Sequence, residues 1–140
     1  MTNDSTPKGE NVVGLMVGPE DGYTLRATLV PADPKKARVT VTYRPALPEA
    51  TMTYRVAVNK DDNPKTKLAA LLHLLKSHVI GWDLLSKAPN GEWVPFPFKP
   101  EHFDKPNVQR ALGMEYLDDM ANLVNGYTMG EVWEEDAKNS

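Results

Sequence analysis

The residues that could hold a metal ion or share a proton are few in this 140-residue chain, and their spacing suits neither task. His73 and His78 are five positions apart, so on a helix their rings would point to different sides, whereas a zinc-binding helix places two histidines four positions apart. Asp118 and Asp119 are adjacent, and adjacent side chains on a helix diverge by about 100°. We therefore expect no metal site and no carboxylate pair that shares a proton, and a solvated helix face explains the two aspartates.

Other catalytic and ligand-binding motifs are incomplete. Residues 61–72 begin like a calcium-binding loop but lack the glycine at the sixth position and the glutamate at the twelfth. Residues 14–18 are too short for a phosphate-binding loop, and no serine lies in the context of a nucleophile elbow. Glu101 and His102 could serve as a base and its orienting partner, although a capping turn before a helix is the simpler explanation. The sequence therefore predicts no enzymatic activity, no metal and no cofactor, and its function becomes a question of binding.

Aromatic side chains gather instead in residues 78–103, where Trp82 is followed by Trp93, Phe96 and Phe98 in a proline-rich stretch. Proline removes a backbone donor, so this stretch suits neither a long helix nor a central strand. The rings can serve as a lid over the core between a sheet and helices. Alternatively, Trp93, Phe96 and Phe98 can border an apolar groove for a partner helix. Both roles can hold together if one face packs inward and the other stays available.

Hydrophobic periodicity predicts the elements that would position these residues. Residues 23–30, 37–44 and 51–58 alternate apolar with polar side chains, which is typical of strands with one buried face. The links between them are short and proline-rich, so we expect antiparallel neighbours. Threonine and arginine occupy the alternate positions, so the outer face of this sheet should be exposed to water.

Two amphipathic helices are predicted after these strands. Asn63 as the N-cap and Pro64 at the first helical position begin a helix that should end near residues 80–82. Asp104 should cap a second helix, which ends near residues 125–126. Each helix carries one apolar stripe. The stripes consist of Leu68, Leu71, Leu72, Leu75, Val79 and Trp82 in the first helix, and of Leu112, Tyr116, Met120, Leu123 and Tyr127 in the second.

These elements predict an α+β fold, with a small antiparallel sheet of about three strands from the N-terminal half packed with two main helices from the C-terminal half. We expect residues 1–10 to be a flexible arm, residues 11–128 to form a single domain and residues 129–140 to be a frayed acidic tail. The apolar island 11–18 would be either an extra strand or an adhesive segment.

Composition limits the kinds of partner. The chain has a net charge of −3 and no cysteine, and acidic residues predominate in its second half. It shows no basic cluster suited to nucleic acid, no apolar run as long as a membrane span and no secretory signal. We therefore expect a cytoplasmic protein that binds neither nucleic acid nor membrane.

The order of these parts resembles that of the tail assembly chaperones of long-tailed, siphovirus-type bacteriophages, especially those of actinobacterial hosts. In both, a strand with a Tyr-Arg-Pro stretch is followed by a leucine-rich helix, a Trp-Asp pair, a turn with Gly-Glu and prolines, and a closing amphipathic helix. The likeness covers residues 37–125, and the aromatic stretch here is heavier than the family pattern needs. The matching positions are Tyr43, Arg44, Pro45, Trp82, Asp83, Gly91, Glu92, Val94, Pro95, Pro100 and Glu101.

This resemblance implies a non-enzymatic role in virion morphogenesis, in the cytoplasm of the host cell. Such chaperones bind the tape measure protein, keep it soluble, promote assembly of the tail tube protein and then leave. The family often has a longer frameshifted form of the same chain as a further partner. The alternative is a structural virion protein, either a head–tail connector or a tail terminator ring subunit.

The aromatic stretch and the two helical stripes supply the residues that we expect to contact the partner. Exposed apolar side chains bind helices, and prolines between them limit unwanted strand pairing. The predicted partner-binding residues are Trp82, Trp93, Phe96, Phe98, Leu75, Val79, Tyr116 and Met120.

Overall fold

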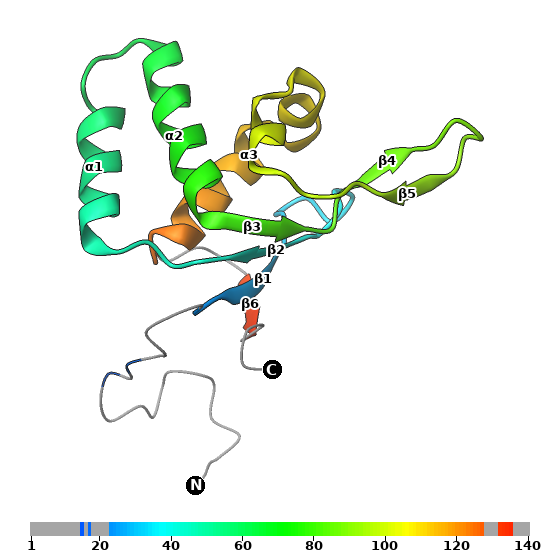
Figure 1. Ribbon diagram of the computed structural model, residues 1–140, viewed down its shortest axis with the longest axis horizontal. Coiled ribbons are helices and arrows are strands. Elements are labelled where there is room, and N and C mark those ends of the chain that lie inside the picture. Colours follow the sequence, from blue (N-terminus) through cyan, green and yellow to red (C-terminus); the bar gives the residue numbers. More distant parts are fainter. Residues whose placement is uncertain (1–14, 16, 18–22, 128–131, 136–140) are drawn as a thin grey trace, which may run out of the picture.

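The computed structural model of the chain describes residues 15, 17, 23–127 and 132–135, and for the last segment the backbone alone. Helices and strands alternate irregularly along the chain (Figure 1). In chain order they are β1 (Leu25–Leu29), β2 (Val39–Tyr43), α1 (Pro48–Val58), α2 (Pro64–His78), β3 (Val79–Trp82), β4 (Leu85–Lys87), β5 (Trp93–Pro95), the 3-10 helix η1 (Pro100–Asp104), α3 (Pro106–Val124) and β6 (Val132–Glu135).

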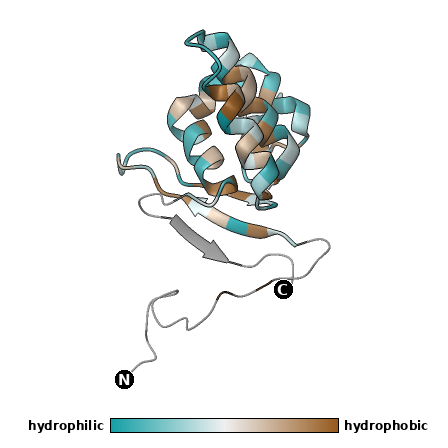
Figure 2. Cartoon of the chain, turned by 90° about the vertical axis from the view of Figure 1, so that its left-hand side faces the viewer, coloured by the Kyte–Doolittle hydropathy of each residue, from teal (hydrophilic) through white to brown (hydrophobic). Residues whose placement is uncertain are grey.

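A four-stranded antiparallel sheet has the order β3-β2-β1-β6, and the helices lie on one of its faces (Figures 1 and 2). Val39, Val41 and Tyr43 of β2 are buried toward the helices, as the alternation of residues 37–44 predicts. On the opposite face, the hydroxyl groups of Thr28 and Thr40 are hydrogen-bonded at 3.0 Å. The predicted α+β class is confirmed, with helices on one side of the sheet and a polar face on the other.

The prediction that residues 51–58 form a strand is wrong, because they form most of helix α1. Pro48 stands in the first turn, where its fixed φ suits a helix and its missing N–H costs nothing, and Glu49 follows it. Thr51, Tyr54 and Val58 recur at helical spacing and are the more buried side of this helix. The place beside β2 is taken instead by β3, in which Trp82 pairs with Val41.

The predicted start of α2 is confirmed: the Asn63 side chain accepts a hydrogen bond from the Lys65 N–H at 2.9 Å, and Pro64 is the first helical residue. The helix ends at His78 rather than near residues 80–82, because the chain becomes extended at Val79 and enters β3. Leu71, Leu72, Leu74 and Leu75 of α2 are buried. The stripe is therefore the side of α2 that packs into the core.

The second predicted helix begins after a separate 3-10 turn, so Asp104 closes η1 rather than capping α3. Lys105 precedes α3 and makes no side-chain capping bond. Inside α3, Gly113 has φ 66° and ψ 175°, which kinks the helix in a conformation that other residues rarely adopt. The helix nevertheless keeps a buried stripe that includes Leu112 and Met120.

The tail expected to be frayed contributes to the sheet, because β6 pairs with β1 along four residues. Leu29 lies opposite Val132 and Arg26 opposite Glu135. The predicted arm 1–10 lies outside the described residues. Of the island 11–18 the structure describes Leu15 and Val17, which are exposed and belong to no strand.

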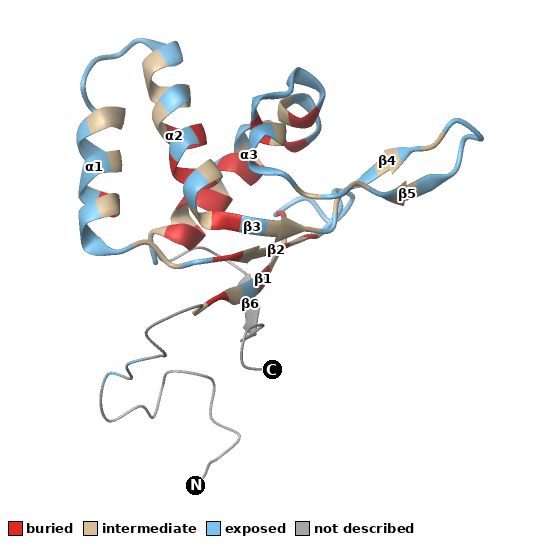
Figure 3. Cartoon of the chain, in the orientation of Figure 1, coloured by how far each residue is buried: buried red, intermediate tan, exposed pale blue. Residues whose placement is uncertain are grey.

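The core lies between the sheet and the helices α2 and α3 (Figure 3). Phe103 of η1 closes one side of it and is fully buried. Apolar burial on this scale is the main stabilising term of a domain this size. The largest fully buried side chains are Tyr43, Phe103, Leu29, Leu75, Met120, Val41, Val79 and Val124.

Candidate functional site

Four of the predicted partner-binding residues, Leu75, Val79, Tyr116 and Met120, belong to the core. Leu75 and Met120 have no exposed surface, and the other two are below one-tenth exposed. The Tyr116 hydroxyl donates a hydrogen bond to the carbonyl oxygen of Ala37, which fixes α3 to the loop before β2. Both helical stripes face inward, so these four residues offer no surface to a partner in the folded protein.

Trp82, Phe96 and Phe98 form an aromatic cluster that packs against Phe103 of the core. The Trp82 indole N–H donates to the Phe96 carbonyl oxygen at 2.7 Å, and its ring meets that of Phe98 edge-on at 4.8 Å between centroids. His102 stacks on Phe96 at 4.7 Å. All three predicted residues are half-buried and pack against the core, so they act as the lid that the sequence allows.

Asp83, which belongs to the family-like Trp-Asp pair, also has a structural role. Its carboxylate accepts a hydrogen bond from the Thr40 N–H at 2.9 Å, and its own N–H donates to the Thr40 carbonyl at 3.1 Å. These two bonds join the end of β3 to β2. The Trp-Asp pair therefore fixes the place where the chain leaves the sheet for the aromatic segment.

Trp93 is the predicted residue that lies on the surface, on a hairpin that projects from the body (Figure 1). Strands β4 and β5 pair antiparallel, with Leu85 opposite Pro95 and Lys87 opposite Trp93. Directly opposed and alternate residues share one side of a hairpin, so these four form a single surface, here called the hairpin face. Trp93 is 64% exposed and Leu85 is 57% exposed, and the Lys87 ammonium lies 5.7 Å from the centre of the Trp93 ring.

A second apolar surface lies on helix α1. Leu47, just before the helix, is 74% exposed, Met52 is 62% exposed and Val56 is 72% exposed. Met52 and Val56 are four positions apart and so lie on the same side of the helix. The one buried residue of α1 is Thr51, which is polar. Helix α1 thus keeps apolar side chains in water on its outer side, while its inner side combines the Thr51 hydroxyl with the half-buried Tyr54 ring, which packs against the core.

Polar contacts hold the inner side of α1. The Thr51 hydroxyl donates to the Asn125 side-chain oxygen at 2.8 Å, and the Arg55 Nε donates to the Tyr127 hydroxyl at 2.8 Å. Both partners lie at the end of α3, so α1 is fixed to the body through directional bonds. The apolar side chains on its outer side are not required for this attachment. Leu47, Met52 and Val56 together give this side of α1 an exposed apolar surface.

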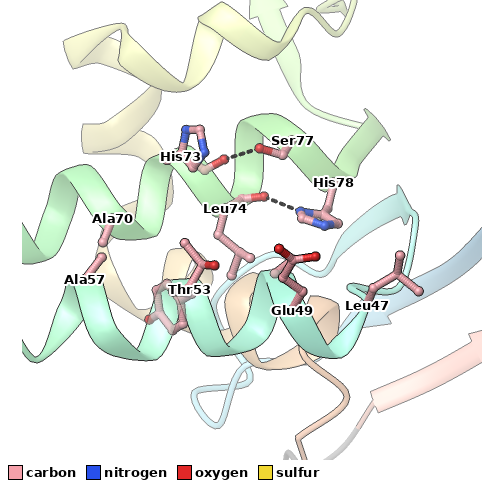
Figure 4. Close-up of a pocket in the computed structure, with 11 residues that line it drawn as sticks. Leu47, Glu49, Thr53, Ala57, Ala70, His73, Leu74, Ser77 and His78 are labelled. Carbon is pink, nitrogen blue, oxygen red and sulfur yellow. Dashed lines mark hydrogen bonds between the residues drawn. The ribbon is translucent and has the colours of Figure 1, made fainter.

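A groove of about 370 Å³ runs between α1 and α2 (Figure 4). Ala50, Ala57 and Ala70 line it, and such short side chains let an incoming residue approach the helix backbones. It adjoins a shallower hollow over the outer side of α1, formed with Met52 and Val56. We call the two together the α1 groove. Its lining residues are Leu47, Glu49, Ala50, Met52, Thr53, Tyr54, Val56, Ala57, Ala70, His73, Leu74, Ser77 and His78.

Two of the polar side chains that line the α1 groove, Ser77 and His78, are turned to backbone oxygens of α2. The Ser77 hydroxyl donates to the His73 carbonyl at 2.7 Å, and the His78 Nδ1 lies 2.9 Å from the Leu74 carbonyl, which makes this nitrogen the donor (Figure 4). Burial raises the pKa of the Tyr54 hydroxyl, whose ring forms part of the wall. These contacts leave a mainly apolar surface for a ligand.

Glu49 is the one carboxylate among the lining residues, which include no lysine or arginine. It makes no ion pair with any residue in the described part of the chain. Its side chain reaches from α1 toward α2 in Figure 4. The α1 groove therefore combines an apolar floor with one negative charge near one end.

Within residues 23–127, no three His, Asp or Glu side chains come together as metal ligands would. Burial raises the pKa values of Asp118 and Asp119 on α3, but these carboxylates lie outside the α1 groove. None of the helices that the structure describes is long and apolar enough to cross a membrane. Both surfaces are mainly apolar, and each carries one charged side chain, Lys87 on the hairpin face and Glu49 in the α1 groove.

The sequence prediction missed the α1 groove because it assigned residues 51–58 to a strand. A strand would have placed Met52 and Val56 toward the core, together with Tyr54. The available signal was the run Leu47-Pro48-Glu49, since proline in a first turn followed by an acidic residue is typical of a helix start.

Comparison with known proteins found no matching family model, no matching curated protein and no matching solved structure.

Proposed function

We propose that this chain is a non-enzymatic binding protein, an assembly chaperone that holds an apolar helix of another protein in the α1 groove. The observation that supports this most directly is the exposed apolar side of α1, where Met52 and Val56 lie one helical turn apart beside an apolar groove. The sequence resemblance to tail assembly chaperones names the partner class: the tape measure protein of a long-tailed phage, bound in the cytoplasm of the host cell.

The α1 groove lies between two helices, which suits the apolar ridge of a third helix. An amphipathic helix presents apolar residues three, four and seven positions apart, and a groove between two helices accepts such a ridge. Covering an exposed side chain such as Leu47, Met52 or Val56 contributes about 1.5–3 kcal/mol before the costs of association. Methionine adapts its shape to different neighbours, which suits a chaperone that meets many segments of a long partner.

The proposal includes release of the partner to the tail tube protein and cooperation with a longer frameshifted form of the chain. Binding through a shallow, solvent-open groove is compatible with release, since small interfaces are usually transient. A net charge of −3 opposes aggregation of free copies that carry exposed apolar side chains.

Co-expression with the cognate tape measure protein tests the proposal. We expect that protein to remain soluble with the wild-type chain and to precipitate with a Met52→Ser/Val56→Ser variant. Removal of two such contacts should weaken binding by about tenfold or more. The matched control is Met114→Ser, because Met114 is 54% exposed on α3 and lies outside the α1 groove.

Circular dichroism should show that the double variant folds, because both side chains are exposed. If the tape measure protein is equally soluble with the double variant, or without this chain, the chaperone proposal fails.

The projecting hairpin favours a second candidate, a permanent ring subunit such as a head–tail connector or tail terminator. An arm that carries an exposed tryptophan is suited to reach a neighbouring subunit in a ring. Quantitative mass spectrometry of purified particles separates the two: a chaperone is absent from them, whereas a ring subunit is present in a fixed copy number.

A further inference from the structure

We propose that the hairpin face of one copy of this chain docks into the α1 groove of a second copy. The inference concerns self-association and does not depend on the identity of any other partner. It rests on three features of the described residues: a rigid apolar projection, a hollow of suitable character, and opposite charges beside them.

Hydrogen bonds hold the β4–β5 hairpin in a fixed shape at its base and at its tip. Its base is held by the Trp82–Phe96 hydrogen bond and the aromatic cluster, and a further bond joins the Phe96 N–H to the Leu84 carbonyl at 2.9 Å. At its tip, the Ala88 N–H donates to the Glu92 carbonyl at 2.7 Å. A preformed arm loses little conformational freedom on binding, which favours association.

The hairpin face offers the kind of residue that dominates protein interfaces. Trp93 and Leu85 stand side by side on it, and tryptophan is the residue most enriched among the contacts that carry binding energy. The α1 groove offers an apolar hollow floored by Ala50, Ala57 and Ala70. An indole ring needs such short side chains beneath it to make close contact.

The charges of the two surfaces are complementary. Lys87 lies beside Trp93 on the hairpin face, and Glu49 lies in the α1 groove without an ion-pair partner among the described residues. If the Trp93 ring enters the α1 groove, the adjacent ammonium can approach the Glu49 carboxylate. Such a pair at the edge of an interface sets orientation more than strength.

The two surfaces lie at opposite ends of the molecule, with α1 at one side and the hairpin at the other (Figure 1). One copy therefore cannot fill its own α1 groove, and the contact must join different copies. Because two different surfaces meet, the contact is heterologous, and repeated copies give a ring or an open chain. A single projection in a shallow groove buries a small area, so we expect weak, concentration-dependent association.

Self-association would cover the exposed apolar residues of α1 while no other partner is bound. It shares the α1 groove with the proposed chaperone function, so a partner helix would compete with the hairpin. The readouts remain separate, because self-association is measured on the purified chain alone. Failure here would leave the co-expression result unaffected, and the converse also holds.

Sedimentation velocity of the purified chain from about 1 μM to about 1 mM tests the inference, a range that covers weak interfaces. We expect oligomers to grow with concentration. Trp93→Ser should raise the dissociation constant by about tenfold or more. Met114→Ser, which alters an exposed apolar residue outside both surfaces, should leave it unchanged.

Charge exchange tests the orientation. Lys87→Glu and Glu49→Lys should each raise the dissociation constant by about threefold to tenfold, and the double variant should return it to near the wild-type value. If either single change acted only by disturbing the fold, the second charge reversal would not restore the wild-type dissociation constant.

A mixing experiment tests the heterologous geometry. Trp93→Ser keeps an intact α1 groove. Ala57→Glu, which places a carboxylate among the residues that line both hollows of the α1 groove, keeps an intact hairpin face. Each variant should be monomeric at a concentration where the wild-type chain associates, while the mixture forms a complex of one copy of each. No larger oligomer should form, because the free hairpin face of that complex lacks Trp93 and its free α1 groove carries the substitution of the second variant. A chain that stays monomeric at every concentration, an association that Trp93→Ser leaves unchanged, or a mixture without complex would overturn the inference.

Discussion

Helices α1 and α2 are neighbours of similar kind that use their apolar residues in opposite ways. α2 turns Leu71, Leu72, Leu74 and Leu75 into the core, so its apolar side chains stabilise the fold. α1 packs Tyr54 against the core and is joined to the end of α3 by hydrogen bonds, but it turns Met52 and Val56 into water. The contrast shows that an apolar stripe has no fixed meaning, because its role depends on whether another element of the chain covers it.

The largest effect expected from this contrast is on stability. Leu75→Ala should lower the free energy of unfolding by about 2–5 kcal/mol, because Leu75 is fully buried and its truncation leaves a cavity. Val56→Ala should change it by less than about 0.5 kcal/mol, since Val56 is mainly in water. Urea denaturation followed by circular dichroism measures both. Equal losses at the two positions would show that α1 is covered in solution.

A change at the start of α1 should sharpen the comparison by separating stability from binding. Asn63 caps α2 through its side chain, whereas Leu47 precedes α1 with an extended backbone and no such bond. Leu47→Ser should raise the free energy of unfolding by about 0.5–1 kcal/mol, because serine at this position can cap the helix.

The same substitution should weaken tape measure binding, since it removes an apolar residue from the α1 groove. Thermal denaturation and the co-expression assay measure the two effects. A variant that is more stable and also binds better would argue against Leu47 as a contact residue.

The smallest effect expected is a pH dependence on the inner side of α1. Burial raises the pKa of Tyr54 above its ordinary value of 10.0, and the charges of Asp118 and Tyr127 add to this. The folded protein therefore keeps this proton at pH values where the unfolded chain releases it, so stability is fully present below pH 10 and is lost as the pH rises through the folded pKa. Tyr54→Phe should lose less stability than the wild type between about pH 9 and pH 11, a window around the ordinary tyrosine pKa.

Denaturation midpoints of the two proteins across this pH range provide the measurement. Parallel pH profiles for the two would mean that Tyr54 titrates alike in the folded and unfolded states.

Local sequence signals predicted the parts of the fold that depend on neighbouring residues. The alternation of residues 23–30 and 37–44 indicated β1 and β2, and Asn63 with Pro64 indicated the start of α2. The packing of Trp82, Phe96 and Phe98 against the core fits the lid interpretation. Trp93 lies exposed on the hairpin, and the groove that the sequence suggests beside it stays a prediction. Short-range patterns and capping residues carry this information because they act within one turn or one hairpin.

The errors arose where distant segments decide the outcome. Residues 51–58 alternate as a strand does, yet the position beside β2 goes to β3, and β6 joins the sheet from the far end of the chain. Leu75 and Met120 were wrongly expected to contact a partner, because the apolar stripe of a helix in a globular domain is usually the side that packs into the core. The α1 groove depends on two helices packed together, so the wrong assignment of one helix concealed it.

Strand β6 determines which strand forms one edge of the sheet. It occupies the flank of β1, so the outward-facing backbone groups of β1 are already paired. A chain that stopped at residue 127 would make β1 the edge strand of the sheet. Its unpaired backbone N–H and C=O groups could then pair with a strand of another molecule. A tag or fusion attached beyond Glu135 leaves the pairing of β6 with β1 in place, whereas one that replaces residues 132–135 would move the edge of the sheet from β6 to β1.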